Sequence, residues 1–245
     1  MPSVAKMQLL DLTLPTPAEN LALDEALLEQ AEQGTEPVEL LRLWEPTNPL
    51  VVIGRASKLH EEVDFATCDK RGVPVLRRSS GGATIVTGPG CLMYAVVLSY
   101  EVHPQLSALD VCHRYVMQRI QTALALEVPE VDFQGTCDLT LHGRKFSGNS
   151  LRCKRTHLIY HGTLLYDFDL TLISELLQTP PRMPDYREGR PHESFVTNVP
   201  IPRDILRKRL IEAWEIDGQQ TDWPRAATEK LAAEKYTNPQ WTSMR

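Results

Sequence analysis

The segment VPVLRRSSGGATIVTGPGCLMYAVVLSY, residues 73–100, decides the fold class of this 245-residue chain. It contains β-like apolar runs at 73–78 and 83–87 and a fully apolar strand at 91–100, and glycine-rich turns separate them. Strands that follow one another without an intervening helix do not fit a regular βαβ repeat. This segment therefore favours a mixed or antiparallel sheet.

The sequence on either side of this segment extends the pattern. Apolar β-like runs predict strands at 7–13, 39–45, 50–55, 137–152 and 156–170. Helical spacing predicts helices at 20–33, 62–71, 105–127, 171–178, 204–216 and 226–236, and a proline-rich loop covers 179–202. We expect an α+β fold in which helices flank the sheet. The predicted buried side of the longest helix consists of Leu106, Leu109, Val116, Ile120, Ala123 and Leu124.

Composition limits the classes of partner and the compartment. The formal net charge of -6 argues against sequence-independent binding of nucleic acid, which depends on neutralising phosphates. The longest apolar run, 91–100, is about half the length that spans a bilayer. The five cysteines have no framework-like spacing and fit reduced thiols. We expect a soluble, cytoplasmic protein without nucleic-acid or membrane partners.

The first candidate site is the glycine-rich loop of residues 77–84. Adjacent glycines after a strand let the backbone approach a ligand and point N–H groups at it, and two arginines suit a carboxylate or phosphate. A plain hairpin turn with solvated arginines explains the same residues equally well. The candidate binding residues of this loop are Arg77, Arg78, Ser80, Gly81, Gly82 and Ala83.

Two further candidates lie in the strands after the long helix. Lys145 precedes Ser147 and Gly148, and a lysine beside small residues can lie along a bound anion. Asp138, on the opposite side of its strand from the apolar residues, could hold Mg²⁺ between phosphate oxygens. An ordinary surface hairpin explains these residues as well. The segment His161-Gly162-Thr163 begins another apolar run, and His157 and His161 have a spacing seen in metal sites, although a structural histidine is the commoner case.

The order and spacing of these motifs resemble the lipoate–protein ligase A family, within the group that includes biotin–protein ligases and lipoyl (octanoyl) transferases. The resemblance rests on LALDEALLE (21–29), RLWEPTNPLVVIGR (42–55), RRSSGGATIV (77–86), CDLTLHGRKFSG (137–148) and HGTLLYDFDL (161–170). It implies the catalytic-domain fold of biotin and lipoate ligases. It also implies a single catalytic domain over 1–245, without the accessory C-terminal domain of two-domain ligases.

The resemblance further implies an activity. In such ligases a lipoate or octanoate carboxylate attacks the α-phosphate of ATP, with Mg²⁺, and the acyl-adenylate reacts with a lysine of a lipoyl domain or a glycine-cleavage H-type protein. By position, Arg78, the glycine loop and Ser147–Gly148 would line the acyl and phosphate groups. Lys145 would be catalytic, Asp138 would hold magnesium or the nucleotide, and His161 with Gly162 and Thr163 would shape the acyl end.

Departures from the ligase pattern leave alternatives. Thr87-Gly88 stands where many ligases have His-Asp, and the following Gly-Pro-Gly is similar to octanoyltransferases, which use a carrier-protein thioester and no ATP. Such transferases need a cysteine nucleophile. The predicted loop 128–136 has none, but Cys137 follows it directly and is the candidate for that role. A non-catalytic acyl-binding relative is a third possibility, and a separate accessory subunit is a further expected partner. The loop 186–198, with Arg187, Arg190 and His192, lies where an acceptor or adenylate could be contacted.

Overall fold

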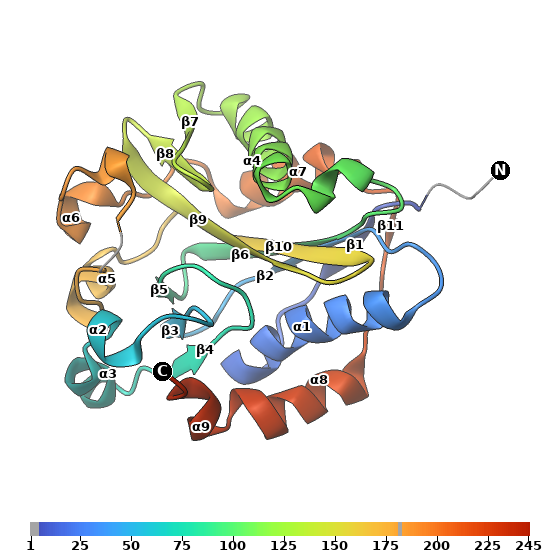
Figure 1. Ribbon diagram of the computed structural model, residues 1–245. Coiled ribbons are helices and arrows are strands. Elements are labelled where there is room, and N and C mark those ends of the chain that lie inside the picture. The colour runs from blue at the N-terminus through green and yellow to red at the C-terminus, as the bar shows by residue number, and fades with distance from the viewer. Residues whose placement is uncertain (1–4, 181–182) are drawn as a thin grey trace.

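The structure, a computed structural model, describes residues 5–180 and 183–245, and these residues form two β-sheets (Figure 1). The strands of the larger sheet are β1 Gln8–Asp11, β2 Leu40–Trp44, β6 Cys91–Ser99, β7 Val131–Gln134, β8 Asp138–Leu141, β9 Arg144–Cys153, β10 His157–Leu165 and β11 Gly218–Gln219. Their order is β11-β1-β2-β6-β10-β9-β8-β7. The smaller sheet consists of β3 Leu50–Ile53, β4 Val75–Arg77 and β5 Ile85–Thr87, in the order β4-β3-β5.

Both sheets are mixed. In the larger sheet β1 pairs in parallel with β2 and β11, whereas all pairings from β2 to β7 are antiparallel. In the smaller sheet β3 is parallel to β4 and antiparallel to β5. The expected fold, a mixed sheet flanked by helices, is confirmed.

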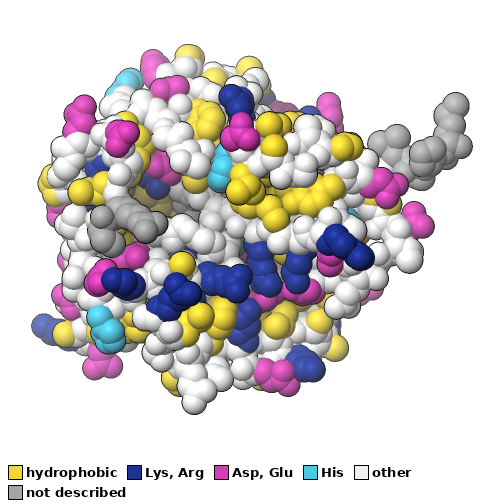
Figure 2. Space-filling model, viewed as in Figure 1, with side chains coloured by type: hydrophobic (Ala, Val, Ile, Leu, Met, Phe, Trp, Pro, Cys, Tyr) yellow, Lys and Arg dark blue, Asp and Glu magenta, His cyan; other side chains and the backbone are white. Residues whose placement is uncertain are grey.

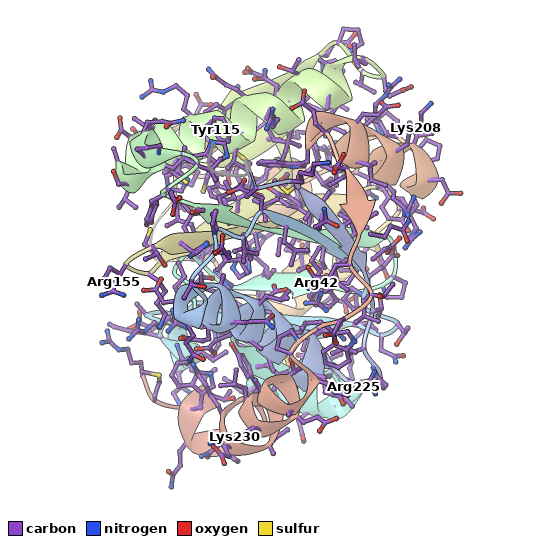
Figure 3. The ribbon with its side chains drawn as sticks, turned by 90° about the vertical axis from the view of Figure 1, so that its right-hand side faces the viewer. Arg42, Tyr115, Arg155, Lys208, Arg225 and Lys230 are labelled. Carbon is purple, nitrogen blue, oxygen red and sulfur yellow. The ribbon has the colours of Figure 1, made fainter. Side chains whose placement is uncertain are left out.

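Helices cover both faces of the larger sheet. Their bounds are α1 Pro17–Gln33, α2 Leu59–Glu62, α3 Phe65–Arg71, α4 Leu109–Ala125, α5 Thr171–Leu176, α6 His192–Phe195, α7 Arg203–Ala213, α8 Arg225–Leu231 and α9 Pro239–Thr242. The views in Figures 1 and 3 place α4 and α7 on one face and α1 with α8 on the other. A capping box between Thr16 and Glu19 and a proline at the first helical position fix the start of α1.

Ion pairs join α1 to two segments far away in the sequence. Arg152 of β9 and Lys235 of the π-helical turn Ala232–Tyr236 both bind Glu25, at 2.5 Å and 2.8 Å. Lys154 binds Glu29 at 2.6 Å. Figure 2 shows Lys and Arg side chains gathered across the middle of the face of the molecule that is seen in Figure 1. These pairs hold the β9–β10 hairpin and the C-terminal segment against α1.

Several sequence expectations needed correction in detail. The loop expected at 128–136 contains β7, which pairs with β8. The long helix is split into a 3₁₀ turn, Pro104–Ser107, and α4, so Leu109 at the first residue of α4 is 55% exposed and not in the core. The proline-rich segment contains a 3₁₀ turn, Asp185–Arg187, and α6, while Pro181 and Arg182 lie outside the described residues. No helix of the described residues is long and apolar enough to cross a membrane.

Candidate active site

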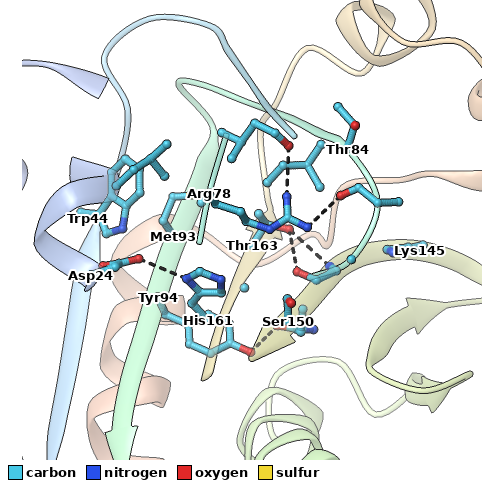
Figure 4. Close-up of a pocket in the computed structure, with 18 residues that line it drawn as sticks. Asp24, Trp44, Arg78, Thr84, Met93, Tyr94, Lys145, Ser150, His161 and Thr163 are labelled. Carbon is cyan, nitrogen blue, oxygen red and sulfur yellow. Dashed lines mark hydrogen bonds and ion pairs between the residues drawn. The ribbon is translucent and has the colours of Figure 1, made fainter. Parts of the chain in front are cut away.

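Two neighbouring chambers lie between the smaller sheet and strands β9 and β10. The first, lined among others by Asp24, Trp44, Met93 and His161, encloses about 630 Å³ of cleft space (Figure 4). The second, whose walls include Phe195, encloses about 730 Å³. Both volumes include space that is open to solvent.

One wall is common to both chambers. It consists of Ala83, Thr84, Ile85, Lys145, Gly148 and Thr163. Three segments that are far apart in the sequence meet there: the end of the glycine loop with β5, the start of β9, and β10. A molecule in one chamber and a molecule in the other would therefore meet at Lys145.

The predicted binding residues differ in which of the two chambers they line. Seven of them line the first chamber: Arg78, Gly82, Ala83, Gly148, His161, Gly162 and Thr163. Ser147 lines the second. The residues Arg77, Ser80, Gly81 and Asp138 do not occur among the described lining residues of either chamber.

Arg78 shapes the glycine loop from inside. Its buried guanidinium donates to the backbone oxygens of Val52 at 3.1 Å and Ala83 at 2.8 Å, and also to Gly81 O. Gly82 has φ +85°, and a Cβ there would lie 2.8 Å from Arg78 Nη2. Burial lowers the pKa of Arg78 to about 10. Arg78 therefore holds the loop in shape with a charge that the loop carbonyls solvate.

Arg77 points away from the chambers. It donates to the backbone oxygens of Gly54 at 2.7 Å, Ser57 at 2.9 Å and Thr242 at 2.8 Å. Trp241 Nε1 donates back to Arg77 O at 2.8 Å. The predicted direct contact between Arg77 and a ligand has no support in this geometry, because its side chain ties the C-terminal segment to the smaller sheet.

A buried polar chain runs behind the first chamber. His161 Nε2 lies 2.6 Å from Ser80 Oγ, and His161 Nδ1 lies 3.2 Å from Asp24 Oδ2 (Figure 4). Arg42, fully buried, binds Asp24 at 2.5 Å. Burial opposes ionisation of Asp24, but Arg42 and His161 outweigh it and hold the pKa of the carboxyl below its usual value. These contacts fix the imidazole ring of His161 at the wall of the first chamber.

Lys145 has a fixed partner at the junction. Its Nζ lies 2.7 Å from Asp138 Oδ1, and Tyr186 donates its hydroxyl to Asp138 Oδ2 at 2.7 Å. Burial and the neighbouring carboxylate raise the pKa of Tyr186 well above its usual value, so the hydroxyl keeps its proton. Asp138 lies on the opposite side of β8 from Leu139, as expected, but it is only 7% exposed because Tyr186 covers it. Asp138 and Tyr186 together position the ammonium group.

The residues around Asp138 do not fit a resident metal ion. Both carboxylate oxygens of Asp138 already have partners. Across residues 5–180 and 183–245, no group of three or more His, Cys, Asp or Glu side chains is placed to hold a metal. Mg²⁺ is usually bound by one or two carboxylates together with waters and substrate phosphates, so Asp138 could contribute to an Mg²⁺ site only in the presence of a bound nucleotide. Asp138 serves as the ion-pair partner of Lys145 in this geometry.

Cys137 is a protonated thiol beside the site. Its Sγ donates to the backbone oxygen of Asn149 at 3.0 Å, and it lines neither chamber. Burial and the adjacent Asp138 raise the pKa of the thiol to about 11. Because the thiolate is the nucleophilic form, this environment disfavours a nucleophilic role.

Some site residues had no role in the sequence reasoning. Asp24 and Arg42 occur in LALDEALLE and RLWEP, which carry the family resemblance, yet their contact joins residues 18 apart in sequence. Trp44 and Met93 lie on strands whose residues are all buried, so the sequence pattern does not distinguish these two from the other core residues. Tyr186 lies 48 residues after Asp138, within the proline-rich segment, and nothing in that segment marks it.

Comparison with known proteins adds family membership to this geometry. The sequence model of one family, the lipoyl protein ligase A/B catalytic domain, matches residues 16–213. The "Probable lipoate-protein ligase A" of Mycoplasma pneumoniae is 31% identical over 158 residues, which cover 64% of this chain and 45% of that protein. The octanoyltransferase LipM of Carboxydothermus hydrogenoformans is 30% identical over 181 residues, which cover 66% of this chain and 65% of that protein. The match thus spans between about half and two thirds of these relatives.

A solved structure has the same fold over nearly the whole chain. It comes from a study of a bipartite lipoate protein ligase of Thermoplasma acidophilum and its E2 lipoyl domain. The TM-score is 0.78 at 23% sequence identity, and the superposition covers 98% of both chains. At this identity the likeness shows a shared fold.

Proposed function

Because this chain belongs to the lipoyl protein ligase A/B catalytic domain family, we propose that it attaches a lipoyl or octanoyl group to a lysine of an acceptor protein through an ATP-derived acyl-adenylate. The observation that carries the proposal is the position of Lys145 on the wall that both chambers share. Adenylate formation joins two substrates at one point, and the two chambers meet at one cation.

The charges of the two chambers assign the substrates. The first combines the apolar walls of Trp44 and Met93, which suit an acyl tail, with the cations Arg78 and Lys145, which suit its carboxylate end. The described lining of the second includes Lys145 and Arg187 and no carboxylate, which suits an anionic nucleotide. The fatty carboxyl group then lies at the glycine loop, next to Lys145.

The reaction follows from this arrangement. A carboxylate oxygen of the acyl substrate attacks the α-phosphorus of ATP, and the bond to the bridging oxygen breaks so that pyrophosphate leaves. The lysine amine of the acceptor then attacks the acyl carbonyl, loses a proton, and AMP leaves. In both steps negative charge grows on oxygens beside Lys145, and its pre-placed ammonium group stabilises that charge.

Transfer from a carrier-protein thioester through Cys137 is the competing mechanism. It requires a reactive thiolate in contact with the acyl group. The hydrogen bond from Cys137 to Asn149 O, the raised thiol pKa and the position outside both chambers all speak against it. These observations favour the ATP-dependent route over the thioester route.

The proposed acceptor is a lipoyl domain, as in the Thermoplasma study, or an H-type carrier protein. Residues 1–245 are proposed to act as one catalytic domain, with a separate accessory protein as a further partner. The acceptor must present its lysine where the two chambers join.

The test compares two acyl donors with one purified lipoyl domain. Wild type, Lys145→Ala and the surface control Lys58→Ala, which removes an exposed lysine paired with Glu61, are given octanoate with ATP and Mg²⁺, or octanoyl carrier protein without ATP. We expect product only with ATP, loss of at least roughly 100-fold in Lys145→Ala, and no change in Lys58→Ala. Product from the thioester alone would refute the adenylate mechanism.

A further inference from the structure

Arg187 is a buried cation whose charge has no protein partner among the described residues. The side chain is 3% exposed, and it forms no ion pair with any described carboxylate. Its Nε donates to Arg190 O at 2.8 Å, but its buried Nη2 has no hydrogen-bond partner in the described structure. A buried donor without a partner costs stability, so such a group is conspicuous where it borders a chamber.

The surroundings of Arg187 direct it at the second chamber. Arg187 lines that chamber together with Phe195, and its guanidinium carbon lies 4.7 Å from the centre of the Phe195 ring. Burial, together with the nearby charge of Arg190, lowers the pKa of Arg187. The ring therefore fixes the plane of the guanidinium, while Nη2 has no hydrogen-bond partner among the described residues.

Arg190 has a different role in the same segment. Its guanidinium also lies on the Phe195 ring, at 5.4 Å, but its donors are used on Tyr186 O at 2.8 Å, Gly143 O at 3.0 Å and Arg187 O at 3.1 Å. Arg190 therefore fastens the segment to the β8–β9 turn. The two arginines therefore differ. Arg187 has a donor without a hydrogen-bond partner among the described residues, whereas Arg190 donates to three backbone oxygens.

The chamber geometry tells which part of a nucleotide reaches Arg187. The phosphate that reacts must lie at Lys145 on the shared wall, where the acyl carboxyl group arrives. The rest of the nucleotide extends into the second chamber, between the apolar side chains of Val86, Leu165, Ile173 and Phe195. A flat base fits between such surfaces, and its ring nitrogens accept hydrogen bonds.

We propose that Arg187 recognises the base of the bound nucleotide, by donating a hydrogen bond from its guanidinium to a ring nitrogen of a purine. The inference rests on the proposed function, because it requires that the second chamber binds ATP. It makes Arg187 a specificity-determining residue, and it explains why a cation is buried there without a carboxylate. Arg190 and Tyr186 position the segment that carries it.

The test measures nucleotide binding to the full chain by calorimetry, so neither acceptor nor accessory protein is needed. Wild type, Arg187→Met and the surface control Lys58→Met, which removes an exposed lysine paired with Glu61, are titrated with ATP, AMP, and the 1-, 3- and 7-deaza analogues of ATP, each of which lacks one ring nitrogen. We expect Arg187→Met to bind both ATP and AMP roughly 10- to 100-fold more weakly than wild type. One deaza analogue should show the same loss with wild type and with Lys58→Met, and no further loss with Arg187→Met.

Each other outcome decides the question. If wild type binds ATP and Arg187→Met binds it equally well, the inference is wrong and the ligase proposal stands. If the loss occurs with ATP but not with AMP, Arg187 contacts the outer phosphates and base recognition is refuted. If wild type does not bind ATP, both proposals fall. The analogue series on wild type needs no variant, so it decides base recognition even where Arg187→Met does not fold.

Discussion

The structure predicts that a single methyl group at Gly148 impairs catalysis without unfolding the protein. A Cβ at this position would lie 2.8 Å from Lys145 Cε and 2.9 Å from Lys145 Nζ. Non-bonded carbon atoms normally rest about 3.5–4.0 Å apart, so Gly148→Ala must displace the end of Lys145 by roughly 0.5–1 Å. That displacement pulls the ammonium from Asp138 Oδ1, now 2.7 Å away, and from the reacting oxygens.

The expected effect of Gly148→Ala on the reaction rate is larger than its expected effect on stability. A misplacement of about 1 Å at a reacting centre can cost on the order of 100-fold, so we expect acyl-adenylate formation to slow roughly 10- to 100-fold. The Lys145–Asp138 ion pair is partly exposed and contributes at most about 1 kcal/mol, while replacing a strand glycine by alanine gains about 0.5–1 kcal/mol. The free energy of unfolding should therefore change by less than about 1 kcal/mol.

The assay is a mutant cycle that isolates the effect on Lys145. Wild type, Gly148→Ala, Lys145→Ala and the double variant are compared by their affinity for a non-hydrolysable acyl-sulfamoyl adenosine, which stands for the acyl-adenylate. In Lys145→Ala the added methyl has no ammonium to displace, so the second substitution should cost nothing more. Gly34→Ala, where the nearest atoms to a new Cβ are 3.5 Å away, is the control. Additive losses would refute the reasoning, because they would mean that the methyl group blocks the ligand directly.

Two further predictions concern Cys137 and the Arg42–Asp24 pair. Cys137→Ala should retain ATP-dependent transfer within about twofold, and loss of transfer would instead favour the thioester mechanism. Alkylation of Cys137 at neutral pH should be slow, because the pKa of its thiol is raised to about 11. Arg42→Met should destabilise the fold by about 3–5 kcal/mol, since it leaves Asp24 as an unpaired buried charge. Because the pKa of Asp24 is lowered in the folded protein, its stabilisation is present above its ordinary value of 3.8 and is lost as the pH falls through the lowered value. Urea unfolding of wild type at decreasing pH should show that acid loss, and Arg42→Met should not.

The sequence predicted those parts of the site that depend on local pattern. The strand–glycine–strand segment at 73–100 gave β4, β5 and β6 to within a few residues, and Lys145, Gly148 and His161 do line the chambers. It could not predict contacts between distant segments. Asp24 is buried because Arg42, 18 residues away, forms an ion pair with it and His161, 137 residues away, contacts its second oxygen. Arg77 and Arg78 look equivalent in sequence, but Arg77 at the end of β4 binds the C-terminal segment, whereas Arg78, directly after β4, binds the glycine loop.

The distribution of charge links the fold to the proposed specificity. The first chamber contains the Asp24 carboxylate, which Arg42 compensates, and the guanidinium of Arg78, whose charge is solvated by backbone carbonyls. The second contains two cations, of which Lys145 is compensated by Asp138 and Arg187 is not. An anionic, planar ligand would supply the acceptor that Arg187 lacks, and its phosphate would lie at Lys145 beside the acyl carboxyl group. Under the proposed function, the nucleotide would lie on the side of the shared wall where Arg187 has no partner among the described residues.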